Sequence, residues 1–251
     1  MKKLLLVFIC ISTLALSFSV SAKELKVGLT ELDYPPFYFE VNGEYYGAAL
    51  EISRAVAEKL GHKLVFIRAP WKRIQGYLRS GEIDMMILYF KSTDRARDVI
   101  YTGVSHINES SDLFILYNSD IKFEGRLKEL LAYRFGSIRG YFHGTEFANA
   151  NYLSKDTVSN EEQLIKMLIN GRFDIGVGSK SVIIWHAKNL GLMDKIRFLV
   201  PPLNIGKNYI VFSKARKNAQ DLADEFSNQL RIFLETAEYR AIVHKYNIDS
   251  N

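Results

Sequence analysis

Apolar and polar residues along this chain follow two different spacings, and the alternation between them predicts an ordered series of strands and helices. Short apolar or alternating runs, typical of strands, cover residues 24–30, 62–68 and 84–90. Between them, apolar residues recur at helical spacing over residues 48–61 and 71–81. Each predicted helix ends at a glycine, Gly61 or Gly81, which is a common helix stop signal. This order predicts a mostly parallel sheet with helices on its faces.

A second series of the same kind follows, so the pattern predicts two α/β units in sequence. Its predicted strands cover residues 112–117, 133–138, 173–178, 195–200 and 208–214. Its predicted helices cover residues 126–132, 159–172, 179–190, 221–234 and 238–246. Ser159 and Glu162 have the spacing of a capping box, and Asn42-Gly43 predicts a hairpin turn in the first unit. The amphipathic helix over residues 221–234 needs an apolar face to pack against.

The first residues have the composition of a secretory signal rather than of a folded domain. Lys2 and Lys3 precede a long apolar run, and Val20 and Ala22 supply the residues that a signal peptidase inspects. We therefore expect residues 1–22 to be a signal peptide, with cleavage after Ala22 and export to the periplasm. The alternative is a membrane anchor, although the apolar run has only about the shortest length that spans a bilayer.

Composition narrows the class of protein further. Cys10 is the only cysteine and lies within the predicted signal, and a mature chain of this size needs no disulfide scaffold. Removing Lys2 and Lys3 from 33 basic residues leaves 31, against 28 acidic ones, so the net charge is +3. That balance, without a charge block, predicts no nucleic-acid partner. The five histidines are scattered without the paired spacing of metal ligands, so we expect neither a metal site nor a cofactor.

Four segments, in this order, resemble the polar amino acid family of periplasmic solute-binding proteins, the type 3 extracellular solute-binding domain. The segments are "LKVGLTELDYPPFYFEVNGEYYGAALEISRAVAEKLG", "WKRIQGYLRSGEIDMMI", "STDRARDVIYT" and "AEYRAIVHKYN". The third carries the family's arginine motif, in which Arg95, Val99, Tyr101 and Thr102 keep the spacing. The resemblance covers nearly all of the mature chain.

This resemblance implies the α/β, two-lobed periplasmic-binding-protein fold of type II, the Venus flytrap. Residues 23–117 with 208–251 would form lobe 1 and residues 118–207 lobe 2. Two crossing strands, expected over residues 113–117 and 208–212, would act as the hinge for closure on a ligand. The implied function is delivery of a small carboxylate-bearing solute, an amino acid or an amino-acid-like molecule, to an inner-membrane ABC permease. We expect a monomer.

The resemblance also implies which residues contact the ligand. Arg95 would bind the carboxylate, since the family has an arginine at this spacing for that role. A guanidinium group offers a planar fork that matches a carboxylate, and the end of a buried strand faces the crevice of an open α/β sheet. The alternative is a surface arginine paired with Asp94 or Asp98. Tyr34 and Trp71 stand where the family places aromatic rings around the ligand side chain, with core packing as their alternative.

Other candidate ligand-binding residues depart from the family pattern. Ser92 either donates to the same carboxylate or caps the following turn, and Phe90 replaces a small hydroxyl side chain of many members. In lobe 2, the run "RGYFHGT" stands where the family has a Gly-Thr-Thr cradle for a carboxylate, which puts Tyr141 and Phe142 there, and Arg139 at its start is a further candidate. Ser179 stands at the position of the family aspartate that binds the α-ammonium, and a neutral hydroxyl does not replace that charge.

The sequence leaves the ligand and two rival functions open. Either the ligand lacks an α-ammonium, or another acidic residue supplies the charge, with Asp33 and Glu31 as the nearest candidates. The leading interpretation is a binding protein that is not an enzyme. A periplasmic enzyme on the same fold, similar to cyclohexadienyl dehydratases, would need a general acid, for which His143 or Glu146 are the candidates. A detached sensor domain is the other alternative.

Overall fold

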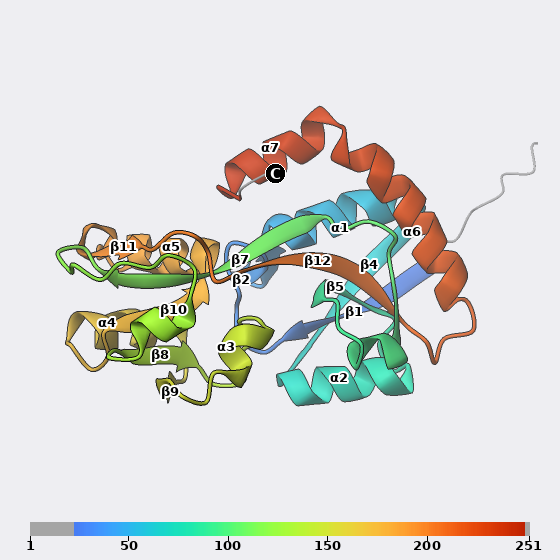
Figure 1. Ribbon diagram of the computed structural model, residues 1–251. Coiled ribbons are helices and arrows are strands. Elements are labelled where there is room, and N and C mark those ends of the chain that lie inside the picture. The colour runs from blue at the N-terminus through green and yellow to red at the C-terminus, as the bar shows by residue number, and fades with distance from the viewer. Residues whose placement is uncertain (1–22, 249–251) are drawn as a thin grey trace, which may run out of the picture.

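The computed structural model describes residues 23–248, which form two groups of strands and helices joined by two long strands (Figure 1). The predicted signal peptide, residues 1–22, lies outside the described residues. Within residues 23–248, no helix combines the length and the apolar character needed to cross a membrane.

The chain alternates between strands and helices throughout. The strands are β1 (Lys23–Thr30), β2 (Phe39–Val41), β3 (Glu44–Tyr46), β4 (His62–Ala69), β5 (Met85–Phe90), β6 (Val99–Tyr101), β7 (Ile107–Leu116), β8 (Arg134–Ile138), β9 (Ser154–Val158), β10 (Ile175–Ser179), β11 (Ile196–Phe198) and β12 (Asn204–Ser213). The α-helices are α1 (Ala48–Lys59), α2 (Trp71–Ser80), α3 (Thr145–Asn149), α4 (Glu161–Ile169), α5 (Lys180–Asn189), α6 (Ala219–Leu234) and α7 (Ala237–Lys245). The 3₁₀ helices of residues 23–248 are η1 (Arg95–Arg97), η2 (Leu127–Leu130) and η3 (Met193–Lys195).

Ten of the described strands form one continuous sheet in the order β4-β1-β5-β12-β7-β10-β8-β9, with β11 beside β7 and β6 beside β12, and β2 and β3 form a separate hairpin. In one lobe β1 pairs in parallel with β4 and β5, and in the other β8 pairs in parallel with β9 and β10. The prediction of parallel sheets with helical crossovers is therefore confirmed. Carboxyl ends of parallel strands are where such sheets bind ligands, and each lobe has a set of them.

Strands β7 and β12 connect the two lobes, as Figure 1 shows. Residues Ile107–Ser111 of β7 pair antiparallel with Asn204–Asn208 of β12, and the rest of β7 pairs with β10 and β11. The described β7 begins five residues before the strand predicted at 112, so its polar first half was missed. The two crossing strands pair through an earlier part of β7 than the predicted residues 113–117, and their role as a hinge stays a prediction. The lobe boundaries at residues 117 and 208 stay a prediction.

The C-terminal helices pack on the first lobe, which supplies the apolar face that the amphipathic pattern requires. Leu222, Phe226, Leu230 and Phe233 recur every three or four residues along α6 and are buried in the core that α1 also enters. Burial of each such side chain contributes about 1.5–3 kcal/mol. On α7, Tyr246 follows the last turn and its hydroxyl accepts a hydrogen bond from the Gly47 backbone N–H.

Several local predictions are corrected by the structure. The N-cap of α4 is Asn160 rather than Ser159, because the Asn160 side chain accepts from the backbone N–H of Gln163. The Gln163 side chain accepts in turn from the Ser159 N–H, so Asn160 and Gln163 supply the side-chain acceptors at this helix start, one residue later than predicted. The helix expected at 126–132 is only the 3₁₀ turn η2. The Asn42-Gly43 turn is confirmed, and both residues have positive φ angles.

Candidate ligand-binding cleft

Arg95 lies just beyond the carboxyl end of β5, in η1, with its side chain half-buried against aromatic rings. Its guanidinium carbon is 4.6 Å from the ring centroid of Tyr89 and 5.3 Å from that of Trp71. Its Nη1 donates to the backbone carbonyl of Phe90 at 3.3 Å. These contacts fix the guanidinium while leaving several of its five N–H donors for a ligand. Cation–π contacts of this kind contribute about 0.5–2 kcal/mol.

The two aspartates that could have paired with Arg95 have other partners. Asp98 accepts from Arg79 Nε at 3.0 Å, and Asp94 lies 3.5 Å from Arg97. None of the ion pairs among residues 23–248 includes Arg95. The Arg95 guanidinium therefore has no carboxylate partner among the described residues, and its N–H donors have the geometry that matches a carboxylate.

Trp71, Ser92 and Phe90 surround this arginine. Trp71 begins α2, is half-buried, and lies 5.8 Å from Tyr89 between ring centroids. Ser92 is exposed, and its hydroxyl accepts from the Arg95 backbone N–H at 3.3 Å, which is the local capping alternative. The Phe90 ring covers Gly206 of β12 so closely that a Cβ on Gly206 would lie 2.2 Å from it. Glycine at position 206 therefore makes room for Phe90.

A cavity of about 270 Å³ lies between the lobes next to this ring. Phe90 and Lys91 line it from the first lobe, Phe142 and Thr145 from the second, and β12 contributes Lys207 among others. Two lysines and several aromatic rings make this space favourable for a small molecule with a negative charge and an apolar part.

A second polar cluster lies at the crossing of the hinge strands and contains Glu109. The Glu109 carboxylate accepts from the Tyr34 hydroxyl at 2.5 Å and from Asn208 Nδ2 at 2.9 Å. Glu109 is only 6% exposed, and burial raises its pKa, although the hydrogen bonds from Tyr34 and Asn208 oppose that shift. Burial and the Glu109 charge raise the pKa of Tyr34, so its phenol stays protonated and donates.

The second lobe completes this cluster. The Tyr141 ring lies edge-on to Tyr34, with the centroids 6.0 Å apart. His143 is buried, and burial lowers its pKa to about 4. Ser179 is the last residue of β10 and pairs with Ser111 of β7. It therefore lies on the strand next to β7, which carries Glu109. Burial raises the pKa of Glu161, at the first turn of α4, and the Glu109 charge raises it further.

The structure thus divides the predicted site residues into two groups. Trp71, Phe90 and Ser92 gather around Arg95, whereas Tyr34, Tyr141 and Ser179 gather around Glu109. Arg139 belongs to neither group: it is exposed, and its backbone N–H donates to Val158.

The acidic residues considered for the missing charge are placed elsewhere. Asp33 accepts from Arg68 at 2.7 Å, and Glu31 is exposed. Sequence reasoning missed Glu109, Glu161 and Asn208. The alternation of polar residues in "INESSD" at the start of β7 was the available signal, because one face of a crossing strand is buried.

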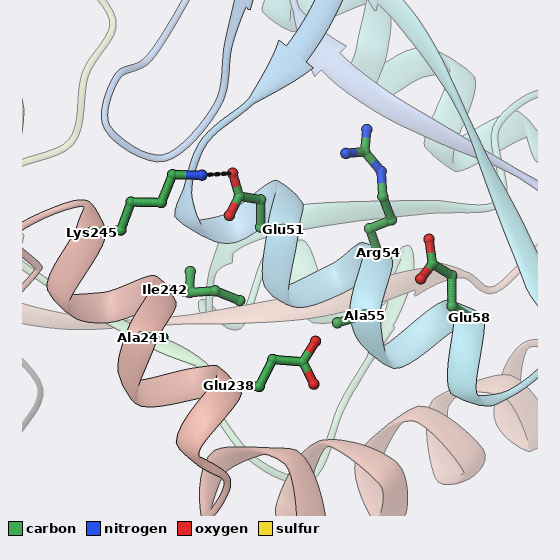
Figure 2. A pocket seen from close by; sticks show the side chains of 8 residues that line it. All are labelled: Glu51, Arg54, Ala55, Glu58, Glu238, Ala241, Ile242 and Lys245. Atoms are coloured by element: carbon green, nitrogen blue, oxygen red, sulfur yellow. Dashed lines mark hydrogen bonds and ion pairs between the residues drawn. The ribbon is translucent and has the colours of Figure 1, made fainter.

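A larger groove, of about 390 Å³, lies on the first lobe between α1 and α7 (Figure 2). Figure 2 shows Lys245 reaching Glu51, and their Nζ and Oε1 atoms are 2.8 Å apart. Glu238 pairs with Lys59 at 3.4 Å. The groove lies away from the strand ends, and its charges are partly neutralised within the chain, so the interlobe cleft is the better candidate for ligand binding.

The two lobes, the two crossing strands and the cleft between strand ends define a solute-binding protein of the type II periplasmic-binding-protein fold. The chain belongs to the bacterial extracellular solute-binding proteins, family 3, which it matches over residues 25–249. It is similar to the "Probable amino-acid-binding protein YxeM" of Bacillus subtilis (strain 168), with 26% identity over 176 residues. That similarity covers 68% of this chain and 65% of the relative, which is less than two thirds of the relative's length.

Solved structures share the fold at lower sequence identity. A histidine kinase sensor domain with similarity to periplasmic binding proteins has a TM-score of 0.76 and 22% identity, covering 90% of this chain and 96% of that one. An ancestral arginine-binding protein bound to arginine has a TM-score of 0.72 and 23% identity, covering 90% and 99%. The two-lobed fold expected from the sequence is therefore confirmed.

Proposed function

We propose that this protein is the exported solute-binding component of an ABC importer. It captures a small carboxylate-bearing solute, an amino acid or an amino-acid-like molecule, between its lobes. It then presents the solute to a permease in the inner membrane and acts as a monomer, without catalysing a reaction on the solute. Membership of a family of extracellular solute-binding proteins supports this proposal.

The observation that carries the proposal is the state of Arg95. It is a half-buried guanidinium at a strand end, oriented by Tyr89 and Trp71, with Asp94 and Asp98 bound to other arginines. A carboxylate accepts two parallel hydrogen bonds from such a group, and these bonds are about twice as strong as neutral ones. The nearby Lys91 adds to the positive potential at the interlobe cavity.

Closure between the lobes is the proposed capture step. Rings from the two lobes already meet at Tyr34 and Tyr141, and also at Phe39 and Trp185, whose centroids are 5.2 Å apart. Rotation about the paired parts of β7 and β12 would open these contacts and admit the solute.

A thermal-shift screen of the purified protein against amino acids, small carboxylates and amines tests this function. A solute that binds only the folded state raises the melting temperature. Arg95→Ala should then weaken binding of the identified solute by at least about 2 kcal/mol, or roughly 30-fold, because a carboxylate in the closed cleft loses its partner.

Arg97→Ala is the matched control, since Arg97 lies in the same turn, is exposed and pairs with Asp94. We expect it to bind as the unmodified protein does. If no solute in the screen binds, or if Arg95→Ala binds as tightly as Arg97→Ala while remaining folded, the carboxylate-binding function is wrong.

The enzymatic alternative has less support from the site. His143, one candidate acid, is buried, and burial lowers its pKa to about 4, so near neutral pH it is a neutral imidazole rather than the imidazolium that acts as a general acid. Glu146, the other, is exposed on α3. Turnover of prephenate-like cyclic carboxylates by the purified protein would nevertheless establish this alternative. The same binding screen would identify the ligand of a sensor domain as well as that of a carrier. The fold alone does not distinguish a sensor from a carrier.

A further inference from the structure

The lobes also meet at a place apart from the candidate ligand-binding residues, through the rings of Phe39 and Trp185. Phe39 is on β2, in the hairpin of the first lobe, and Trp185 is on α5, in the second lobe. Their ring centroids are 5.2 Å apart, and the ring planes are inclined by 46°. Both side chains are half-buried. The described residues that line the 270 Å³ interlobe cavity include neither of them, so a solute in that cavity does not need to touch this contact.

Helix α5 has two apolar faces that pack on different lobes. Ile183 and Ala187, four residues apart, are buried in a core cluster shared with α4 of the second lobe. Val182 and Trp185, three residues apart, lie together on another face of the helix. Val182 is 1% exposed and belongs to the core cluster of the first lobe. One face therefore fixes α5 in its own lobe, and the other face packs on the first lobe.

The first lobe holds Phe39 in place through two tyrosines. Phe39 pairs with Tyr46 across the β2-β3 hairpin, and their ring centroids are 6.1 Å apart. The Tyr246 ring lies edge-on to Phe39, with the centroids 6.3 Å apart. The Tyr246 hydroxyl accepts from the Gly47 N–H at 3.1 Å and donates to the Glu51 carboxylate at 2.5 Å. Phe39 therefore presents a supported ring to the second lobe.

The contact depends on how the lobes are arranged. Strands β7 and β12 connect the lobes, so rotation about their paired residues separates Phe39 from Trp185. Separation would expose the two rings and Val182 to water, which disfavours the open arrangement. An aromatic pair contributes a factor of about 2–12 to an equilibrium constant, in addition to the effect of the buried area.

This contact differs in one respect from the ring contact between Tyr34 and Tyr141. Those two tyrosines also join the lobes, but they are themselves candidate ligand-binding residues. Trp185 is six residues after Ser179, the candidate ligand-binding residue that precedes α5, which places it about 9 Å farther along the helix. A substitution at Trp185 therefore changes the contact between the lobes without removing a candidate ligand contact.

We propose that Phe39 and Trp185 form an aromatic latch that favours the closed arrangement of the lobes before any solute enters. This inference rests on the closure step of the proposed function, and it assigns part of the driving force for closure to the protein alone. A contact that exists only in the closed state adds the same factor to the affinity of every solute that closure encloses. The aromatic latch thus affects how tightly a solute is held, but not which solute is selected.

Spin labels on the two lobes measure the closed fraction directly. Cys10 is the only cysteine of the chain, so Cys10→Ser combined with Lys72→Cys and Asn149→Cys gives two labelling sites. Lys72 on α2 and Asn149 on α3 are exposed, and the two helices lie in different lobes on the same side of the molecule (Figure 1). The protein is unfolded in urea, dialysed and refolded, which removes any solute carried through purification. Pulsed electron paramagnetic resonance then gives the distribution of distances between the labels with no solute added.

We expect the labelled protein to show a population at short distances, and the ring variants to lose part of it. The ratio of short to long distances should fall at least about threefold in Trp185→Ala and in Phe39→Ala. The double variant should fall no further than the larger of the two single effects, because either change removes the same contact. Tyr152→Ala, which removes an exposed ring from the second lobe, is the matched control and should keep the distribution.

X-ray scattering on the unlabelled, refolded proteins gives a second readout that does not depend on labels. Trp185→Ala and Phe39→Ala should each have a larger radius of gyration than the unmodified protein, whereas Tyr152→Ala should not. The two ring variants change opposite lobes, so if one of them does not fold, the other still provides the comparison.

Three outcomes overturn the aromatic latch: no short-distance population in the labelled protein, an unchanged distribution in the ring variants, or a shift of these variants toward shorter distances. Each of these leaves the carboxylate-binding function standing, because that function is tested by the solute screen and by Arg95→Ala. Failure of the screen would overturn the proposed function and leave the distance measurement valid, since no solute takes part in it.

Discussion

His143 should give the protein a stability that decreases in acid, and the size of the effect follows from its burial. The residue is 5% exposed, its Nδ1 lies 3.4 Å from Ser111 Oγ, and its Nε2 has no hydrogen-bond partner within the described residues. Burial lowers its pKa to about 4. In the unfolded chain His143 takes up a proton at about pH 6.5, whereas in the folded chain its imidazole stays neutral until about pH 4. The stability that depends on a neutral His143 is therefore fully present above about pH 6.5, and it is lost as the pH falls toward about 4.

The difference between these two pKa values corresponds to roughly 3 kcal/mol in the free energy of unfolding. About 2 kcal/mol of it is lost between about pH 7.5 and about pH 5. Glu109 and Glu161 act in the opposite direction, because burial raises their pKa values and acid relieves the cost of their charges. His106, which is buried and whose pKa burial also lowers to about 4, acts in the same direction as His143, so the slope of the unmodified protein alone does not isolate His143.

Urea unfolding of the unmodified protein and of His143→Asn at these two pH values isolates the contribution. Asparagine does not titrate, so the stability of the variant should fall by about 2 kcal/mol less than that of the unmodified protein. His244→Asn, which removes an exposed histidine from α7, is the control for loss of an imidazole. If both proteins lose the same free energy on acidification, His143 is not a neutral buried imidazole and the reasoning is refuted.

Further predictions concern the backbone and the motion of the lobes. Gly206→Ala should reduce the free energy of unfolding by about 1–3 kcal/mol, because the new Cβ would lie 2.2 Å from the Phe90 ring. Gly76→Ala, in α2 with nothing within 4 Å of the new Cβ, should instead increase the free energy of unfolding by about 0.5–1 kcal/mol. Urea unfolding measures the two variants, and equal effects on their stability would contradict the packing argument. Asn160→Ala should cost about 1 kcal/mol through loss of the α4 cap, whereas Ser159→Ala should cost less, since only Asn160 caps through its side chain. X-ray scattering should show a smaller radius of gyration with a saturating solute from the screen than without it, and an unchanged radius from an open free form would argue against closure.

Strands and helices with strong periodicity were predictable, and elements of mixed composition were not. The helix ending at Gly61 and the buried strand β5 were found because one physical pattern, apolar spacing, accounts for each. The polar half of β7 was missed because Asn108, Glu109 and Ser110 do not form an apolar pattern. That half is a strand because it pairs with β12, which is more than ninety residues away in the chain. Sequence spacing carries no information about such a partner.

The sequence by itself determined the α/β order, the resemblance to solute-binding proteins and the prediction that Arg95 faces a ligand. These three depend on the spacing of residues along the chain, which can be read directly from the sequence. Only the tertiary structure decided that Asp94 and Asp98 pair with other arginines, and that Glu109 meets Tyr34 from the loop after β1. The reason is physical: burial and charge balance are properties of groups brought together by folding, so the cost of an unneutralised carboxylate is defined only once its neighbours in space are known.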